Sequence, residues 1–495
     1  MKNAVEELLK KENVRTNLSN LRAMIKEPAA KKKLSKMLEE HHEFVISLLD
    51  EEDAKTRRNA ALLIGDLEWD EAVGKLYEAY EKETMLFVRS SYLDALFSLQ
   101  AEKLVDKLQE RMNTILNTEL TTETRKHAEE ELRALRKLLI KYQGITRHSF
   151  SEDGKYHDVV LITNRNHREI VRRQVEEKED TAKLHPLGVL VNTSRINRLF
   201  EIRTFREMVF PIHTEGLISA EPEEAAKALW EADIYDILTS LHKEEGPFYY
   251  RIDCKGNMEL EERSRFTKKL GAALDHLSAG RMVNSAGDYE VELRLVANKE
   301  GKFFACLKLS TVEDHRFDYR KNAISASIHP STAALMMTIA QPYLKEDAQI
   351  MDPFCGVGTM MIERDKCVPA REMYGTDIYG EAIVKARENA MLAGKNINYI
   401  HRDFFDFKHD YKFDEVVTNM PVRGKKTKEE LDRLYSNFFD KVADIFMGKG
   451  TIVMYTNEMG LVKKQLRLRK GFKILQETCM QTKSNFFLLI IEFEG

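Results

Sequence analysis

A glycine-rich turn between an apolar segment and a helix-forming segment constrains the fold of this 495-residue chain most strongly. The turn, Asp352–Thr359, reads Asp-Pro-Phe-Cys-Gly-Val-Gly-Thr. Glycines let backbone amides close on a ligand where a strand ends, and the next helix presents unpaired N–H groups there. A dehydrogenase-type fingerprint needs a third glycine at the position of Met361. We therefore predict a nucleotide-cofactor loop of another kind, with an ordinary strand-to-helix turn as the alternative.

The region around this turn, residues 319–495, has the rhythm of an α/β Rossmann-like, doubly wound sheet. Helix-forming segments separate the first five predicted strands, whereas only a short polar stretch, 478–485, joins the last two. That stretch is too short for a helical crossover, so the last two strands should form an antiparallel pair. The predicted strands are 349–352, 373–377, 397–401, 413–419, 451–456, 472–477 and 486–493.

The rest of the chain divides into two further regions. Residues 1–147 show helical spacing throughout, and an arginine followed by three apolar residues recurs 32 positions later. This predicts an all-α, HEAT-like domain, with an irregular helical bundle as the alternative. Residues 148–318 mix strands and helices and predict an α+β region. The repeated positions are Arg57, Ala61, Ile64 and Leu67, then Arg89, Leu93, Leu96 and Leu99. The predicted strands of the second region are 158–163, 189–192, 208–212, 248–252, 291–295 and 303–307.

Composition narrows the class of protein. A formal net charge of −4 and a pI near 6.4 exclude a uniformly basic nucleic-acid coat, so any RNA contact must use local patches. Five scattered cysteines without a Cys-x-x-Cys pair predict reduced thiols and no metal site. The N-terminus lacks a signal-peptide core and no apolar run approaches a membrane span, which predicts a cytoplasmic protein without membrane contact.

Two acidic residues follow predicted strands where a cofactor would lie. Asp377 can accept hydrogen bonds from both ribose hydroxyls, although a helix N-cap role is the alternative. Asp403 can accept the adenine amino group with Phe404 against the ring, although a solvated loop acid is the alternative.

Asn419-Met420-Pro421-Val422 ends another apolar run and fits an amine substrate. The amide oxygen of Asn419 and the carbonyl of Met420 can accept the two N–H bonds of an exocyclic amine, and Pro421 restricts the turn. Methyl transfer to such a nitrogen requires chiefly positioning. Val422 has no π-face on which a base would stack, which leaves Phe404, Tyr319 and Tyr435 as candidate replacements.

Two basic clusters lie near these motifs. Arg423, Lys425 and Lys426 follow the Asn419 motif and suit RNA phosphates, with a solvated lysine run as the alternative. Arg316 and Arg320 form a second candidate RNA contact just before the C-terminal region.

At these residues the chain resembles the THUMP-domain class I RNA methyltransferases, especially the branch that makes N2-methylguanosine in tRNA. The resemblance spans about residues 155–495 and is strongest at Asp352–Thr359, where the family usually reads Asp-Pro-x-Cys-Gly-Ser-Gly-Thr. Ser327–Ala334 resembles the segment that helps enclose the cofactor, and Arg203-Thr204-Phe205-Arg206 resembles the family's Arg-Thr-x-Arg strand. Residues 148–318 would then be a ferredoxin-like piece plus a THUMP-like RNA-binding module.

The resemblance implies S-adenosylmethionine as the cofactor and methylation of guanosine N2 in structured RNA, with tRNA as the partner. Cys355 would be a loop residue and not a nucleophile. The helical domain is additional to the family pattern and suggests a protein partner or a longer RNA contact. The implied cofactor-binding residues are Asp352, Phe354, Cys355, Gly356, Gly358, Thr359, Asp377, Ile378, Asp403, Phe404, His329 and Pro330.

Other functions remain open at this point. Val422 and the added helical domain are compatible with a catalytically impaired methyltransferase fold that serves as an RNA-binding or scaffold protein. DNA adenine or a protein amine is a further possible substrate, against which the THUMP-like region argues.

Overall fold

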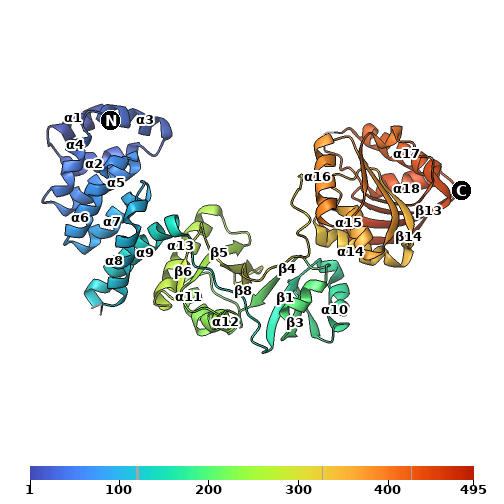
Figure 1. Cartoon of the computed structure of the whole chain (residues 1–495), viewed down its shortest axis with the longest axis horizontal. Helices are drawn as coiled ribbons and strands as arrows, with labels where there is room; N and C mark the ends of the chain where they lie inside the picture. The colour runs from blue at the N-terminus through green and yellow to red at the C-terminus, as the bar shows by residue number, and fades with distance from the viewer. Residues whose placement is uncertain (119–121, 326, 425) are drawn as a thin grey trace.

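The computed structural model describes residues 1–118, 122–325, 327–424 and 426–495. Three regions follow one another along the chain and lie in a row (Figure 1). The first is entirely helical among its described residues. Its elements are α1 (Lys2–Leu9), α2 (Val14–Met24), α3 (Pro28–Leu38), α4 (His42–Ser47), η1 (Leu48–Asp50), α5 (Ala54–Leu67), η2 (Asp70–Ala72), α6 (Val73–Lys82), α7 (Leu86–Phe97), η3 (Glu102–Leu104), α8 (Val105–Leu116) and α9 (Thr122–Gln143).

The recurring arginines of the helical region share one acidic residue. Arg57 forms a bidentate ion pair with Glu83, at 2.9 and 2.7 Å, and Arg89 donates to the backbone carbonyl of Glu83. The two helices that carry these arginines lie so close that a Cβ on Gly65 would meet the Cα of Ala95 at 2.6 Å. The predicted helical content is confirmed, while the HEAT-like arrangement stays a prediction.

The middle region is built around an eight-stranded mixed sheet with the strand order β2-β3-β1-β4-β8-β7-β5-β6. All six predicted strands are present. Two strands were missed, because β2 is largely polar and β6 has only three residues. The elements are β1 (His157–Ile162), η4 (Arg165–His167), α10 (Arg168–Glu176), β2 (Thr181–His185), β3 (Gly188–Thr193), η5 (Ile196–Glu201), β4 (Glu207–Pro211), α11 (Pro222–Glu231), α12 (Ile234–Ser240), β5 (Phe248–Lys255), α13 (Leu260–Leu277), β6 (Met282–Asn284), β7 (Val291–Ala297) and β8 (Phe303–Leu309).

The C-terminal region contains a seven-stranded sheet with the order β11-β10-β9-β12-β13-β15-β14. Strand β15 runs antiparallel to both β13 and β14, which confirms the predicted closing pair. The elements are α14 (Pro330–Ala340), η6 (Gln341–Tyr343), β9 (Ala348–Asp352), α15 (Thr359–Cys367), β10 (Ala370–Asp377), α16 (Gly380–Leu392), β11 (Asn398–His401), η7 (Phe404–Asp406), β12 (Phe413–Asn419), α17 (Lys428–Ile445), β13 (Phe446–Thr456), α18 (Met459–Leu468), β14 (Phe472–Gln481) and β15 (Phe486–Glu494).

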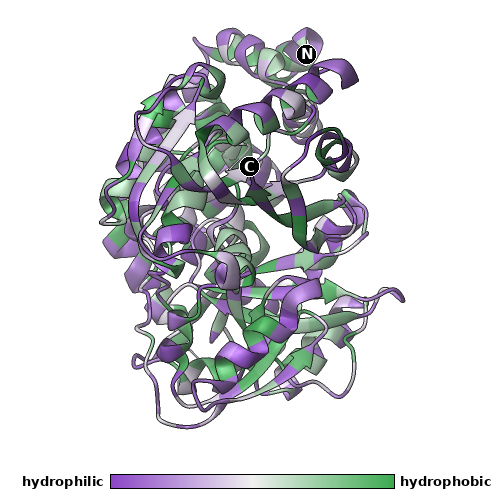
Figure 2. Ribbon diagram, turned by 90° about the vertical axis from the view of Figure 1, so that its right-hand side faces the viewer, coloured by the Kyte–Doolittle hydropathy of each residue, from purple (hydrophilic) through white to green (hydrophobic). Residues whose placement is uncertain are grey.

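Helices cover both faces of this C-terminal sheet. One hydrophobic cluster joins α14, α15 and α16 to one face, and a second joins α17 and α18 to the other. Hydrophobic residues gather along the strands (Figure 2). The result is a three-layer α/β architecture in which successive parallel strands end at the same edge, where loops can form a site.

The predicted boundaries at residues 147 and 318 stay predictions, although the last helix of the first region ends at Gln143 and β1 begins at His157. No helix in the described part of the chain has the length and apolar character needed to cross a membrane.

Candidate active site at the strand ends of the C-terminal sheet

The glycine-rich turn joins β9 to α15 and requires glycine at two positions. Gly356 and Gly358 have φ values of 53° and 83°, in the left-handed region that side chains disfavour. A Cβ on Gly358 would also meet the hydroxyl of Tyr399 at 2.2 Å. The amide of Gly356 donates to Asp377 at 2.9 Å, so the end of β10 holds the turn in place.

A cavity of about 560 Å³ lies over this turn. Most of the predicted catalytic and cofactor-binding residues line it, from three different strand ends and from the start of α14. These residues are Asp352, Phe354, Cys355, Gly356, Thr359, Asp377, Asn419, Met420, Pro421 and His329. The structure therefore brings the predicted cofactor turn and the predicted amine-binding motif into one space.

Asp352 is 1% exposed, and its carboxylate has one unused oxygen. Its Oδ1 accepts the amide of Phe354 at 3.1 Å, whereas its Oδ2 has no hydrogen-bond partner among the described residues. Burial raises the pKa of the Asp352 carboxyl to about 7. A ligand that brings a cationic amine would pair with Oδ2 and favour the ionised carboxylate.

The hydroxyl of Thr359 is also buried without a partner in the described part of the chain, whereas the hydroxyl of Thr418 lies next to the Asp352 carboxylate. Buried polar groups are normally paired, so the two unused groups of Asp352 and Thr359 fit a ligand with its own polar atoms. Since S-adenosylmethionine carries an ammonium group, a carboxylate and ribose hydroxyls, the residues present fit that group.

Asp377 already holds backbone groups with both oxygens, because Oδ2 accepts from Gly356 and Oδ1 from Tyr379, each at 2.9 Å. Each carboxylate oxygen can accept more than one hydrogen bond, so the predicted ribose contact stays a proposal. The side chain does not cap α16, whose N-cap is Tyr379.

His329 and Cys355 are unsuited to charged chemistry in this cavity. Burial, together with nearby Arg206, Arg320 and Arg316, lowers the pKa of His329 to about 4, so the imidazole is neutral near pH 7. Its ring accepts from the backbone amide of Ser331 at the start of α14. Burial raises the pKa of the Cys355 thiol well above its usual range, which agrees with a loop residue.

The Asn419 motif is fixed by its neighbouring strand. Asn419 pairs in register with Tyr455 of β13, and the amide of Met420 donates to the Tyr455 carbonyl at 2.9 Å. Met420 is buried, while the Val422 side chain is 47% exposed at the cavity. The two proposed acceptors therefore lie on a backbone held by the sheet.

Several predicted cofactor residues do not line the cavity. Asp403 is exposed and caps η7 through Phe405, while Ile378 and Pro330 lie outside the lining. The prediction that Phe404 faces the adenine ring is wrong in this structure, because its ring is 1% exposed and packs near Phe354 and Phe438.

The candidate aromatic replacements for Val422 are also buried elsewhere. Tyr319 donates to Glu363 at 2.6 Å, and the Tyr435 hydroxyl pairs with Thr456 at 2.6 Å. Neither lines the cavity. The aromatic side chains that do line it, and that the sequence did not reveal, include Tyr455 and Phe486.

The predicted RNA contacts have different outcomes. Arg423 and Lys426 are exposed and stay candidates, while Lys425 lies outside the described residues. The prediction for Arg316 is wrong, because its side chain is only 2% exposed and is bonded to Asp314 and to backbone carbonyls. Arg320 is half-buried and donates to the carbonyl of Ile328, so it offers little surface to RNA.

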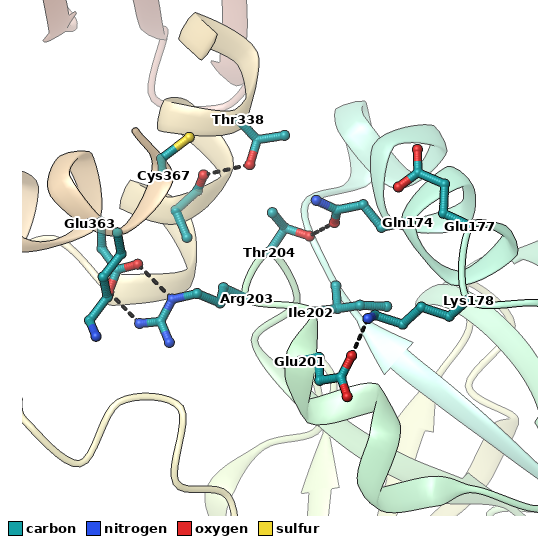
Figure 3. A pocket seen from close by; sticks show the side chains of 12 residues that line it. Gln174, Glu177, Lys178, Glu201, Ile202, Arg203, Thr204, Thr338, Glu363 and Cys367 are labelled. Atoms are coloured by element: carbon teal, nitrogen blue, oxygen red, sulfur yellow. Dashed lines mark hydrogen bonds and ion pairs between the residues drawn. The ribbon is translucent and has the colours of Figure 1, made fainter. Parts of the chain in front are cut away.

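The middle region also contributes to this part of the molecule. Arg203 forms a bidentate pair with Glu363 of α15, at 3.0 and 2.7 Å, beside a pocket between the two regions (Figure 3). Three residues further on, Arg206 lines the candidate active-site cavity itself. The sequence marked this segment only as part of a strand.

Comparison with known proteins decides the nature of the C-terminal region. Residues 318–485 match the model of the RMKL-like methyltransferase domain. The C-terminal region is therefore similar to that methyltransferase domain over residues 318–485. This bears out the predicted resemblance to the THUMP-class methyltransferases and implies S-adenosylmethionine as the cofactor of the methyltransferase domain; the HEAT-like addition stays a prediction.

Individual relatives cover parts of the chain. An uncharacterised protein of Mycoplasma genitalium is 32% identical over 126 residues, which are 25% of this chain and 27% of that protein. The tRNA (guanine(10)-N2)-dimethyltransferase of Methanothermobacter thermautotrophicus is 26% identical over 155 residues, 30% of this chain and 45% of that enzyme. The chain thus spans less than half the length of either relative.

A solved structure extends the likeness in fold beyond the methyltransferase domain. TrmN from Thermus thermophilus superposes with a TM-score of 0.51 at 18% identity, and covers 68% of this chain and 99% of its own. At this identity the likeness concerns the fold alone.

Proposed function

We propose that the protein is an S-adenosylmethionine-dependent RNA methyltransferase that modifies the exocyclic N2 of a guanosine in tRNA. The observation that carries this proposal is the single cavity that joins the glycine turn to Asn419-Met420-Pro421. A cofactor loop alone would fit many reactions, whereas an amide oxygen and a fixed carbonyl beside it suit an amine acceptor.

The residues of the cavity would act mainly by positioning. Asn419 Oδ1 and the Met420 carbonyl would accept the two N–H groups of the amine and so direct its lone pair. Bound S-adenosylmethionine would supply a methyl group on a sulfonium. Because the Met420 amide is tied to β13, the acceptors need little rearrangement, which favours an in-line approach.

The choice of RNA rests on relatives and on the middle region. A relative named as a tRNA guanine-N2 dimethyltransferase supports a tRNA substrate, and the THUMP-like interpretation of residues 148–318 supports RNA contact. Exposed Arg423 and Lys426 are suited to phosphates near the cavity. A protein partner of the helical region and a cytoplasmic location complete the proposal.

The test is transfer of labelled methyl from S-adenosylmethionine to unmodified tRNA, followed by nucleoside analysis. We expect N2-methylguanosine with the unaltered protein and at least about 100-fold less with Asn419→Ala, because a misplaced amine reacts slowly. Asn3→Ala, an exposed position on α1, is the control for the substitution itself. Full activity of Asn419→Ala would refute the assigned mechanism.

A second function is motivated by Val422, which is exposed at the cavity where a base-stacking aromatic would be expected. A catalytically impaired RNA-binding or scaffold protein would bind tRNA without transferring label. Saturable binding of S-adenosylmethionine in equilibrium dialysis would count against it, whereas RNA binding without cofactor affinity would support it.

A further inference from the structure

An aromatic pair lies on the same sheet face as Asn419. Asn419 pairs in register with Tyr455, and Tyr455 lies in the hydrophobic cluster that also includes Phe486. The rings of Tyr455 and Phe486 stack with centroids 4.8 Å apart and planes 22° from parallel. Both side chains line the cavity, where Tyr455 is 5% exposed and Phe486 is half-buried.

This pair supplies the π-surface that the Asn419 motif lacks at Val422. Base–aromatic stacking contributes substantially to the capture of single bases, and it suits any base because every base has a π-face. Tyr455 covers one side of Phe486, so Phe486 is the ring of the pair that can meet a base entering beside Asn419.

A cationic group reaches the same cavity from the middle region. Arg206 is exposed, and its guanidinium has no hydrogen-bond or ion-pair partner among the residues that the structure describes. Nearby Glu207 does not neutralise it, because that carboxylate is bonded to Arg294 and Lys308. An unpaired guanidinium at the rim of a nucleotide-sized cavity suits a phosphate.

The segment that carries Arg206 is held at each preceding residue. Arg203 forms an ion pair with Glu363, and the Thr204 hydroxyl donates to the Gln174 amide oxygen at 2.5 Å (Figure 3). Phe205 is fully buried, and the Arg206 amide donates to the Ile162 carbonyl at 2.7 Å. Because the backbone is fixed, the guanidinium is presented to the methyltransferase domain at little cost in conformational entropy.

A second set of contacts ties the middle region to the hairpin that carries Phe486. Asn164 donates to the carbonyl of Met480 at 2.8 Å, and His167 lies 2.9 Å from the carbonyl of Cys479. Gln481, the next residue of β14, pairs in register with Phe486 and also lines the cavity. The two regions therefore hold Arg206 and Phe486 around one space.

We propose that Phe486, backed by Tyr455, stacks the target base and that Arg206 binds a phosphate of the same RNA, so that two regions jointly form the nucleotide site. This inference rests on the proposed RNA methyltransferase function and adds a specificity-determining surface to it.

The experiment compares Phe486→Leu and Arg206→Met with the unaltered protein in three measurements: S-adenosylmethionine affinity, unmodified tRNA affinity at several salt concentrations, and methyl transfer. We expect Phe486→Leu to weaken tRNA binding about 10-fold or to raise the KM for tRNA about 10-fold, because leucine keeps apolar bulk but has no π-face. Phe486→Tyr should restore most of this loss. Cofactor affinity should change less than twofold in each variant.

Arg206→Met should lower the slope of log affinity against log salt concentration by about 0.7 to 1, the value of one phosphate contact. A purely structural role of Arg206 would not change this slope. The matched controls are Arg173→Met, whose side chain is 71% exposed on α10, and Tyr411→Leu, 72% exposed outside the cavity.

The outcomes separate this inference from the proposed function. If the unaltered protein methylates tRNA and both variants keep its KM and salt slope, the inference is overturned and the proposed function stands. If no RNA is methylated but both variants weaken tRNA binding as expected, the nucleotide site stands and the proposed function falls. Absence of transfer with unchanged tRNA binding in both variants would overturn both.

Discussion

The two junctions between neighbouring regions are built differently. Where the middle region meets the methyltransferase domain, Arg203 pairs with Glu363, whose side chain is 1% exposed. Asn164, the N-cap of η4, and His167 of η4 also bind backbone carbonyls of β14. Where α9 meets α13, Glu129 and His276 pair at 3.1 Å with both side chains substantially exposed. The ion pair at the first junction is largely buried, whereas the ion pair at the second is exposed to solvent.

This difference follows the position of the candidate site. The buried junction places Arg206 in the cavity of the methyltransferase domain, so a small change of angle would move a proposed RNA contact. The exposed junction between α9 and α13 contains a separate cavity of about 420 Å³. Its lining includes Arg125, Arg133 and Arg136, and it lies away from the glycine turn. We therefore expect activity to depend on the first junction much more than on the second.

Arg203→Ala should have the largest effect, because it leaves the buried Glu363 carboxylate without its cation. Removing one member of a buried pair costs about 3 kcal/mol or more. Chemical denaturation should show this loss, and methyl transfer should fall with it. Arg203→Met combined with Glu363→Gln is the control, since it removes both charges. If Arg203→Ala were as stable as the unaltered protein, the two junctions would not differ in strength.

Asp352→Asn tests a group inside the methyltransferase domain and away from both junctions. Burial raises its carboxyl pKa from 3.8 to about 7, so the folded state is destabilised progressively as the pH rises through that window. Without cofactor, the variant should therefore be clearly more stable than the unaltered protein at pH 8 and nearly equal to it at pH 4.

The same substitution should weaken binding of S-adenosylmethionine, because the amide cannot pair with its ammonium group as a carboxylate does. Thermal unfolding at both pH values and equilibrium dialysis measure the two effects. A variant less stable at pH 8 than the unaltered protein would contradict the raised pKa. Its effect on stability should add to that of Arg203→Ala, since the sites share no partner.

The sequence predicted the parts of the site that lie within one short segment. It failed where contacts between residues far apart in the sequence determine whether a side chain is buried. The glycine turn and Asn419 could be found because each lies at the end of an apolar strand. Phe404 could not be placed, since its neighbour Asp403 is exposed while the ring turns into the core. Arg316 appeared basic and available, but Asp314 and the carbonyls of Ile202 and Phe205 bury it.

Arg206 and Phe486 are the opposite case, because they line the cavity although the sequence analysis did not predict them as site residues. The sequence analysis placed Arg206 in a strand motif and gave Phe486 no role. Their proximity arises only because Asn164 and His167 bind the carbonyls of β14. Strand periodicity predicts which face a residue occupies, but the partner of that face depends on how regions pack.

Asn164→Ala should have an intermediate effect at the buried junction. The substitution removes the hydrogen bond to the Met480 carbonyl and the bond that Asn164 Oδ1 accepts from the Asn166 amide, each worth about 1 kcal/mol. For this variant, the slope of log tRNA affinity against log salt concentration should stay unchanged. The KM for tRNA should rise, because the hairpin that carries Phe486 loses a contact. Asn298→Ala is the control, because it removes side-chain hydrogen bonds in an exposed turn of the middle region, away from the junction. A KM equal to that of the unaltered protein would show that the contacts of Asn166 and His167 with Cys479 hold the hairpin without Asn164.

His276→Ala should have the smallest effect, because it removes only the exposed pair with Glu129. Such pairs contribute less than about 1 kcal/mol, and salt screens them. Stability at moderate salt and methyl transfer should both remain within experimental error of the unaltered protein. A loss as large as that of Arg203→Ala would mean that the helical region constrains the nucleotide site through α13, and the two junctions would then be equivalent in function.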